Sequence, residues 1–143
     1  MSIMLSTEVC RLIIRDKPMP LLQQLQNWTS NGEELVISAV TYGELMAGAL
    51  LTQDRNRHIQ LVSEFCGRLN DILAWDRDAV ERFAHIQLES LQQGKSVNMN
   101  DSMVAAHALS RNIQLLIRED HRLSSVNGLN LLYWMDDKVM TLD

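Results

Sequence analysis

The sequence has little positive charge, few aromatic side chains and only two cysteines. Its 13 Lys and Arg residues are outnumbered by 18 Asp and Glu residues, which gives a formal charge of −5. Broad, nonspecific attraction to nucleic acid usually needs a basic face, so this charge argues against it without excluding a local basic groove. Cys10 and Cys66 both fall within helical patterns, and two such cysteines do not indicate a disulfide-stabilised scaffold.

The chain also lacks any segment typical of a membrane span or a signal peptide. Its longest apolar runs end well short of the roughly 20 residues that a span needs. The N-terminus, MSIMLSTEVC, has neither the basic start nor the long apolar core of a signal peptide. These absences predict a soluble protein of the reducing cytoplasm with no membrane contact. With 143 residues, no repeat and no linker, the sequence predicts one domain over residues 1–143.

Short apolar runs alternate with amphipathic stretches, which predicts an α/β fold with a central, mostly parallel sheet of four to five strands flanked by helices. The expected strands are Ile3–Leu5, Leu35–Ser38, Ile72–Trp75, Ile113–Ile117 and Leu131–Trp134. The expected helices are Thr7–Arg15, a segment after Pro18 and Pro20 that ends near Ser30, Thr41–Leu51, Arg57–Leu69, Asp78–Gln93 and one that begins at Asn100 or Asp101. Gly94 is expected to end its helix as a left-handed cap.

Carboxylates follow several of the predicted strands. Glu44 lies in VISAVTYGELMAGA, Asp101 in NMNDSMVAAHALSRN, and Glu119 and Asp120 follow IQLLIR. A carboxylate that opens a helix after an apolar strand lies at the carboxyl edge of a parallel sheet, where open α/β folds collect ligand sites. Several acids at that edge predict a divalent-metal site. The first strand, however, runs into Ser6, where an acid would complete the cluster.

Each of these residues also has an ordinary structural interpretation. Glu44 is compatible with an acid that interacts favourably with the helix dipole, and Asp101 with a helix N-cap. Glu119 and Asp120 are compatible with a polar turn. Ser6 fits an N-cap better than a nucleophile, because no base is evident beside it.

The order of the motifs resembles the PIN-domain family, and most closely the VapC toxins of VapBC toxin–antitoxin pairs. The segments that carry this resemblance are KPMPLLQQL, ISAVTYGELMAGAL, NDSMVAAHALSRN and VNGLNLLYWMDD, which together span nearly the whole chain. The resemblance implies a PIN-like fold and a ribonuclease whose Glu44, Asp101 and Asp120 hold Mg²⁺ or Mn²⁺, with Glu119 as the alternative to Asp120. It also implies transfer RNA as substrate, a homodimer, and a VapB-like antitoxin that provides the only link to DNA.

The chain departs from the family pattern at the expected site. Ser6-Thr7-Glu8 stands where the family usually has Asp-Thr-Asn, so a hydroxyl occupies the place of the first acidic ligand. Gln87 stands where arginine is common, and Ile117 where threonine is common. A neutral ligand should weaken Mg²⁺ binding, so reduced or lost activity is expected. The alternative function is a catalytically silent PIN domain that binds an antitoxin and co-regulates its operon.

The histidines and basic residues indicate a function less clearly than the acids do. His58 and His85 lie on helical faces, and His107, in an Ala-rich helix, is expected to be packed or satisfied by a backbone partner. Six basic side chains fit either a rim that contacts RNA phosphates or solvated helical faces: Arg11, Arg15, Lys17, Arg55, Arg57 and His58.

Overall fold

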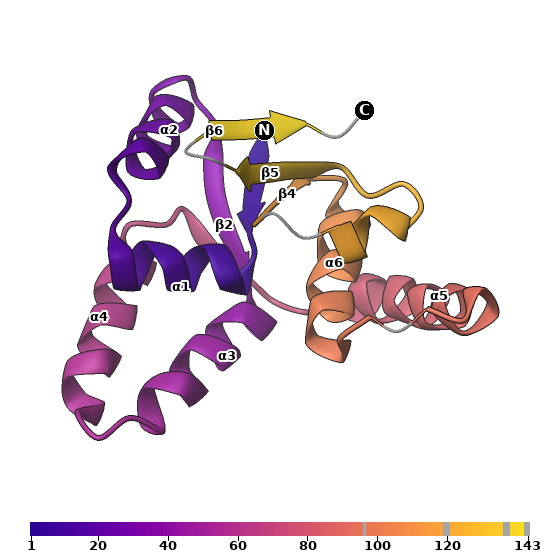
Figure 1. The fold of residues 1–143 in the computed structure, drawn as a ribbon, viewed down its shortest axis with the longest axis horizontal. Coiled ribbons are helices and arrows are strands. Elements are labelled where there is room, and N and C mark those ends of the chain that lie inside the picture. The colour runs from indigo at the N-terminus through magenta and orange to yellow at the C-terminus, as the bar shows by residue number, and fades with distance from the viewer. Residues whose placement is uncertain (96, 119–120, 136–137, 142–143) are drawn as a thin grey trace.

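The computed structural model describes residues 1–95, 97–118, 121–135 and 138–141. Within these residues, six strands form one sheet in the order β3-β2-β1-β4-β5-β6 (Figure 1). The strands are β1 (Ser2–Leu5), β2 (Glu34–Ser38), β3 (Asp71–Leu73), β4 (Gln114–Arg118), β5 (Leu131–Met135) and β6 (Lys138–Thr141). All pairs from β3 to β5 are parallel, and β6 is antiparallel to β5. The predicted mostly parallel sheet is confirmed, and β6 is an addition that the sequence did not indicate.

Six α-helices and one short 3-10 helix, His121–Ser125, connect the strands in the described part of the chain. The α-helices are α1 (Thr7–Asp16), α2 (Met19–Ser30), α3 (Ala39–Leu50), α4 (Arg55–Gly67), α5 (Arg77–Gln93) and α6 (Met99–Arg111). Pro18 is the N-cap of α2 and Pro20 lies in its first turn, where a missing N–H has no intrahelical partner to lose. Gly94 ends α5 with φ of 66°, as predicted. No helix among the described residues combines the length and apolarity that crossing a membrane requires.

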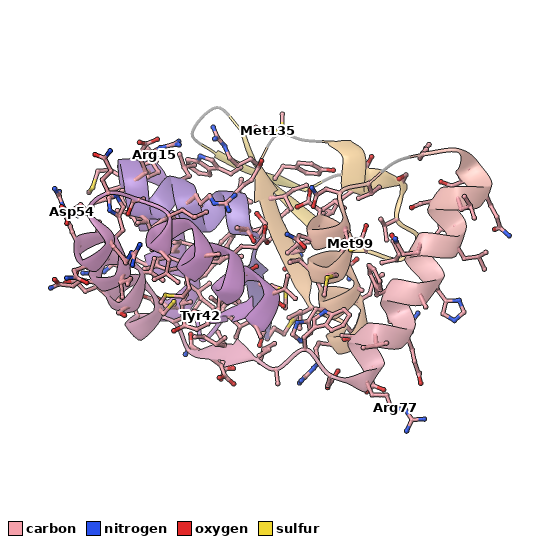
Figure 2. All side chains as sticks on the ribbon, turned by 90° about the horizontal axis from the view of Figure 1, so that it is seen from below. Arg15, Tyr42, Asp54, Arg77, Met99 and Met135 are labelled. Atoms are coloured by element: carbon pink, nitrogen blue, oxygen red, sulfur yellow. The ribbon has the colours of Figure 1, made fainter. Side chains whose placement is uncertain are left out.

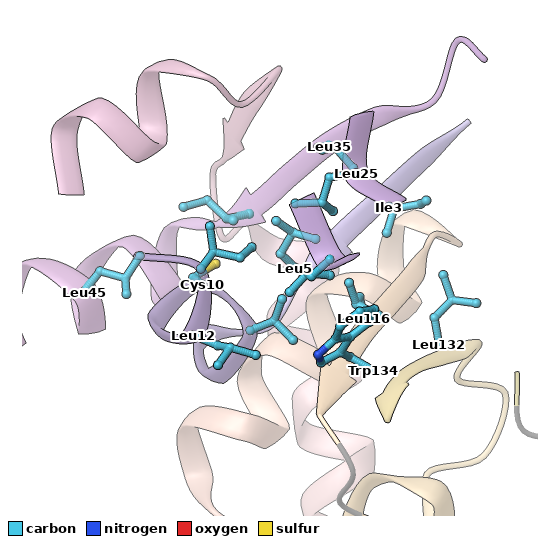
Figure 3. Close-up of a cluster of buried hydrophobic side chains, with 14 of the residues drawn as sticks. Ile3, Leu5, Cys10, Leu12, Leu25, Leu35, Leu45, Leu116, Leu132 and Trp134 are labelled. Atoms are coloured by element: carbon cyan, nitrogen blue, oxygen red, sulfur yellow. The ribbon is translucent and has the colours of Figure 1, made fainter. Parts of the chain in front are cut away.

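Alternate side chains of the central strands enter two different cores. Ile3 and Leu5 of β1 join the core beneath α1, α3 and α4, whereas Met4 joins the core beneath α6 (Figure 3). On β4, Leu116 faces the first core and Leu115 the second. This alternation follows from the two-residue period of a strand, and burial on both faces is typical of parallel sheets.

The two groups of helices lie at opposite ends of the molecule. Figure 1 shows α1, α3 and α4 together on one side, with α5 and α6 on the other. Figure 2 shows the same division from below, with Arg15, Tyr42 and Asp54 toward one end and Arg77 at the other. Helices α1 and α3 begin directly after β1 and β2, so their first turns lie at the carboxyl edge of the sheet. That edge is where the predicted acids were expected.

Candidate active site

Glu44 is held by hydrogen bonds from two other helices. Thr7 Oγ1, on α1, lies 2.8 Å from Glu44 Oε1, and Asn100 Nδ2, on α6, lies 3.2 Å from Glu44 Oε2. Thr7 Oγ1 also lies 3.0 Å from Thr41 Oγ1. Because an ionised carboxylate only accepts, the single hydroxyl proton of Thr7 serves Glu44, which leaves Thr41 as the donor between the two hydroxyls. The Glu44 side chain therefore has a fixed orientation between α1 and α6.

Local sequence explains why Glu44 faces α1. Ser38 ends β2 and caps α3, and its Oγ accepts from the Val40 N–H at 3.1 Å. Thr41 and Glu44 are three residues apart on this helix, so they share one face. Thr41 is fully buried and Glu44 is half-buried. The buried threonine anchors this face against α1, and the carboxylate one turn further reaches the edge of the site.

Ser6 lies at the carboxyl end of β1, next to Thr7. Its Oγ accepts from the Val9 N–H at 3.3 Å, and its own N–H donates to Leu116 O at 2.9 Å. The expectation that Ser6 caps a helix is confirmed. A neutral oxygen thus stands beside the residue that contacts Glu44, at the place where the family pattern has a carboxylate.

Asp101 lies in the first turn of α6, where a negative charge interacts favourably with the helix dipole. The alternative that Asp101 caps this helix is wrong, because the cap is Asn98. Its Oδ1 accepts from the N–H groups of Asn100 at 2.9 Å and Asp101 at 3.3 Å. The helix therefore begins at Met99, one or two residues earlier than predicted. Since Asn100 contacts Glu44, the structure brings Glu44 to the turn that carries Asp101.

Asp120 and Glu119, the remaining predicted ligands, lie outside the described residues. Within the described ranges, no group of three or more His, Cys, Asp or Glu side chains is arranged to hold a metal ion. The described part of the site therefore consists of Glu44, the α6 turn that carries Asp101, and neutral side-chain oxygens. This donor chemistry still fits Mg²⁺, which proteins usually bind through one or two carboxylates while water and substrate phosphate complete the shell.

Thr7, Thr41 and Asn100 are the site residues that the sequence analysis missed. They contact one another or Glu44 across separations of 34 to 56 positions in the chain. The signals available were the three-residue spacing of Thr41 and Glu44, and the position of Asn100 directly before Asp101. Neither signal identifies a partner on another helix.

His107 is fully buried, as expected for a packed residue. Its Nδ1 lies 2.8 Å from Ser38 Oγ at the end of β2, and the backbone of Ala74 is a further hydrogen-bonding neighbour. Burial, and secondly the charge of Arg111, lower the pKa of His107, while Asp76 opposes them. The imidazole is therefore neutral at pH 7.

A groove of about 690 Å³ runs from Glu44 between α1, α3 and α4. Its lining includes apolar side chains such as Ile14, Leu45 and Val62. Five of the six basic residues considered for a rim also line it: Arg11, Arg15, Lys17, Arg57 and His58. The sixth, Arg55, donates to Leu50 O at 3.1 Å. The structure thus places an apolar floor with a basic rim beside Glu44.

The sequence pattern of the PIN domain matches residues 7–129, and the chain belongs to the PIN-domain family. Two relatives are the tRNA(fMet)-specific endonuclease VapC of Shigella flexneri and Ribonuclease VapC2 of Haemophilus influenzae. The first is 30% identical over 131 residues, 92% of this chain and 96% of that protein. The second is 28% identical over 132 residues, 92% of this chain and 97% of that protein.

Solved structures agree with this assignment. A DNA-bound VapBC structure from Salmonella typhimurium contains a chain that is 27% identical, with a TM-score of 0.87 over 94% of this chain and 99% of that one. A VapBC2 structure from Rickettsia felis, at 23% identity, supports the fold, with a TM-score of 0.90 over 94% of this chain and 100% of that one. Within the PIN-domain family, the chain is a VapC toxin of the VapBC type, which confirms the resemblance drawn from the motifs.

Proposed function

We propose that the chain is an endoribonuclease that depends on Mg²⁺ or Mn²⁺ and cuts transfer RNA. The observation that carries this proposal is the Glu44 carboxylate, which Thr7 and Asn100 hold at the turn that bears Asp101. Glu44, Asp101 and Asp120 are the proposed metal ligands, with Glu119 as the alternative to Asp120. The Shigella relative is named for its action on a transfer RNA, which supports this substrate class.

The proposed mechanism relies on carboxylates whose geometry is set before substrate binds. When bound, a divalent cation lowers the pKa of water and stabilises charge that develops on the phosphate. Thr7 and Asn100 each occupy one oxygen of Glu44, which restricts rotation of the carboxylate and leaves its remaining lone pairs for a ligand. Asp101 supplies a second negative charge from a helix rather than a loop, so its position is well defined.

Ser6 sets the level of activity in this proposal. A serine hydroxyl carries no charge, so the remaining acids must hold a dication alone. We therefore propose that this chain cuts RNA more slowly than a site with an acid at position 6 would. The neutral Ser6 also supports the second candidate function, a catalytically silent PIN domain that binds an antitoxin and co-regulates its operon through the antitoxin's DNA-binding part.

The groove beside Glu44 is the proposed docking site for a segment of a VapB-like antitoxin. Its apolar floor and basic rim complement an amphipathic, acidic segment. Such a segment would also cover Glu44 and so block the site. The VapBC structures from Rickettsia felis and Salmonella typhimurium, both bound to DNA, support a VapB-like partner. We further propose a cytoplasmic homodimer, for which the exposed apolar side chains Leu88 and Leu91, three residues apart on α5, provide surface.

Cleavage of a transfer-RNA pool is the direct test of the nuclease function. Purified chain with Mg²⁺ or Mn²⁺ is expected to give discrete fragments that disappear with a chelator and with the Asp101→Ala variant. Intact RNA after incubation with folded wild-type chain would instead favour the silent, antitoxin-binding function. Fragments that disappear with the chelator but persist in the Asp101→Ala variant would contradict the assignment of Asp101.

Thr7→Val removes the hydroxyl that orients Glu44 while keeping a similar volume. We expect Mn²⁺ binding to weaken by about tenfold, as for loss of other groups that orient a metal ligand. We also expect a loss of about 1–2 kcal/mol in the free energy of unfolding, because Thr41 loses a buried partner. Mn²⁺ titration and thermal unfolding measure both effects. Thr29→Val, which removes an exposed hydroxyl contact on α2, is the matched control and should leave Mn²⁺ binding unchanged.

A further inference from the structure

Helix α6 is hydrogen-bonded to α3 and to the N-cap of α3, and these two contacts lie at different distances from the sheet. The outer one is the contact between Glu44 and Asn100. The inner one joins His107 Nδ1 to Ser38 Oγ at 2.8 Å, and both of these residues are fully buried. Helix α3 leaves the sheet at its carboxyl edge, whereas α6 packs against one face of the sheet and its first turn reaches Glu44 (Figure 1). The inner bond therefore joins α6 to the end of β2, at the residue where α3 begins.

The spacing along the two helices relates this inner bond to both acids. Glu44 follows Ser38 by six residues, and Asp101 precedes His107 by six residues. At a helical rise of about 1.5 Å per residue, each acid lies about 9 Å along its helix from the bond. A change in the angle between the helices at Ser38 and His107 would therefore alter the separation of Glu44 and Asp101.

Ser38 makes this contact through Oγ, the same atom that caps the N-terminus of α3. Its Oγ already accepts from the Val40 N–H, and the imidazole is its second partner. The N-cap of α3 is consequently joined directly to α6. A purely apolar side chain at position 107 would fill space but would leave Ser38 Oγ buried with one partner fewer.

We propose that His107 is a positioning residue whose hydrogen bond with Ser38 sets the separation of Glu44 and Asp101 that a divalent cation requires. This role rests on the proposed metal-dependent function. The ring acts as a neutral group, because burial and Arg111 lower its pKa, and Asp76, the cap of α5, is the opposing charge. It does not contact the metal or the substrate in this role.

Two substitutions separate this role from simple core packing. The Nδ2 and Oδ1 atoms of asparagine are two covalent bonds from Cβ, as histidine Nδ1 is, so one of them can take the place of Nδ1 beside Ser38. His107→Asn therefore keeps a hydrogen-bond partner for Ser38 but leaves a cavity. His107→Leu fills the space and removes the partner. We expect Mn²⁺ affinity within threefold of wild type for His107→Asn, and at least about tenfold weaker for His107→Leu. Val104→Ala, a buried truncation on α6 of a side chain that cannot hydrogen-bond to Ser38, should lose stability without loss of Mn²⁺ affinity.

Mn²⁺ titration and thermal unfolding of the wild type and the three variants decide between the two roles. A Mn²⁺ affinity that follows the order of thermal stability would overturn the positioning role, as would unchanged binding by folded His107→Leu. If His107→Leu does not fold, Ser38→Ala removes the same bond from the other side, together with the side-chain cap of α3, and must weaken Mn²⁺ binding at least as much. Wild-type chain that neither binds Mn²⁺ nor cuts RNA contradicts the proposed function, and the role of His107 with it.

Discussion

Ser6→Asp is expected to tighten Mn²⁺ binding by on the order of a hundredfold and to raise RNA cleavage and cellular toxicity with it. The physical reason is the added charge, since affinity for hard cations depends strongly on the number of charged oxygen ligands. At an effective dielectric constant of about 20, a pair of unit charges about 4 Å apart interacts by about 4 kcal/mol. Desolvation of the new carboxylate and repulsion from Glu44 and Asp101 offset part of this, which leaves the smaller expected gain.

This substitution should change the charge of the site and not its fold. Aspartate is as good an N-cap as serine, so the contact with the Val9 N–H has a replacement. The backbone bond from Ser6 to Leu116 does not involve the side chain. Ser63→Asp, on the exposed face of α4, adds the same charge away from the site and serves as the matched control.

Mn²⁺ titration and transfer-RNA cleavage by the two variants test this expectation. Equal gains in both would mean that overall charge, rather than a ligand at position 6, is responsible. A folded Ser6→Asp variant with no gain would show that an acid at position 6 does not restore the site. Gln87 and Ile117 would then become the departures that matter, and the silent, antitoxin-binding function would be favoured.

The sheet could be predicted from sequence because its strands are apolar on both faces. The runs around Met4, Val36 and Leu115 are buried by helices on either side, so they appear as continuous apolar segments between amphipathic ones. Strand β6 was missed because Lys138–Thr141 is short, follows acidic residues and lies at the edge of the sheet. The start of α6 was misplaced because Asn98, Asn100 and Asp101 can all cap a helix, and only the backbone geometry selects Asn98.

The site could be predicted only in part. The sequence indicates which acids follow strands, and the structure places Glu44 at the turn that carries Asp101. The residues that orient Glu44 could not be predicted, because Thr7 and Asn100 are 37 and 56 positions from it and contact it only after the sheet brings three helices together. The hydrogen bond between Ser38 and His107 joins residues 69 positions apart, so it could not be predicted from the sequence for the same reason.

Glu44→Gln is expected to weaken Mn²⁺ binding at least about a hundredfold and to reduce RNA cleavage to background. The variant removes one full charge next to the proposed metal, and each 1.4 kcal/mol of lost interaction corresponds to about a tenfold change. The shape of the side chain is retained, and its amide oxygen can still accept from Thr7. Asn100 can turn its own amide to present an oxygen, so the free energy of unfolding should change by less than about 1 kcal/mol.

The combination of lost binding and retained stability is what distinguishes a metal ligand from a structural acid at this position. Glu64→Gln removes the same charge from the exposed surface of α4 and should leave both Mn²⁺ binding and cleavage as in the wild type. A Glu44→Gln variant that unfolds would indicate that the carboxylate serves mainly to join α1 and α6 through Thr7 and Asn100. A folded variant that still binds Mn²⁺ like the wild type would exclude Glu44 from the metal site.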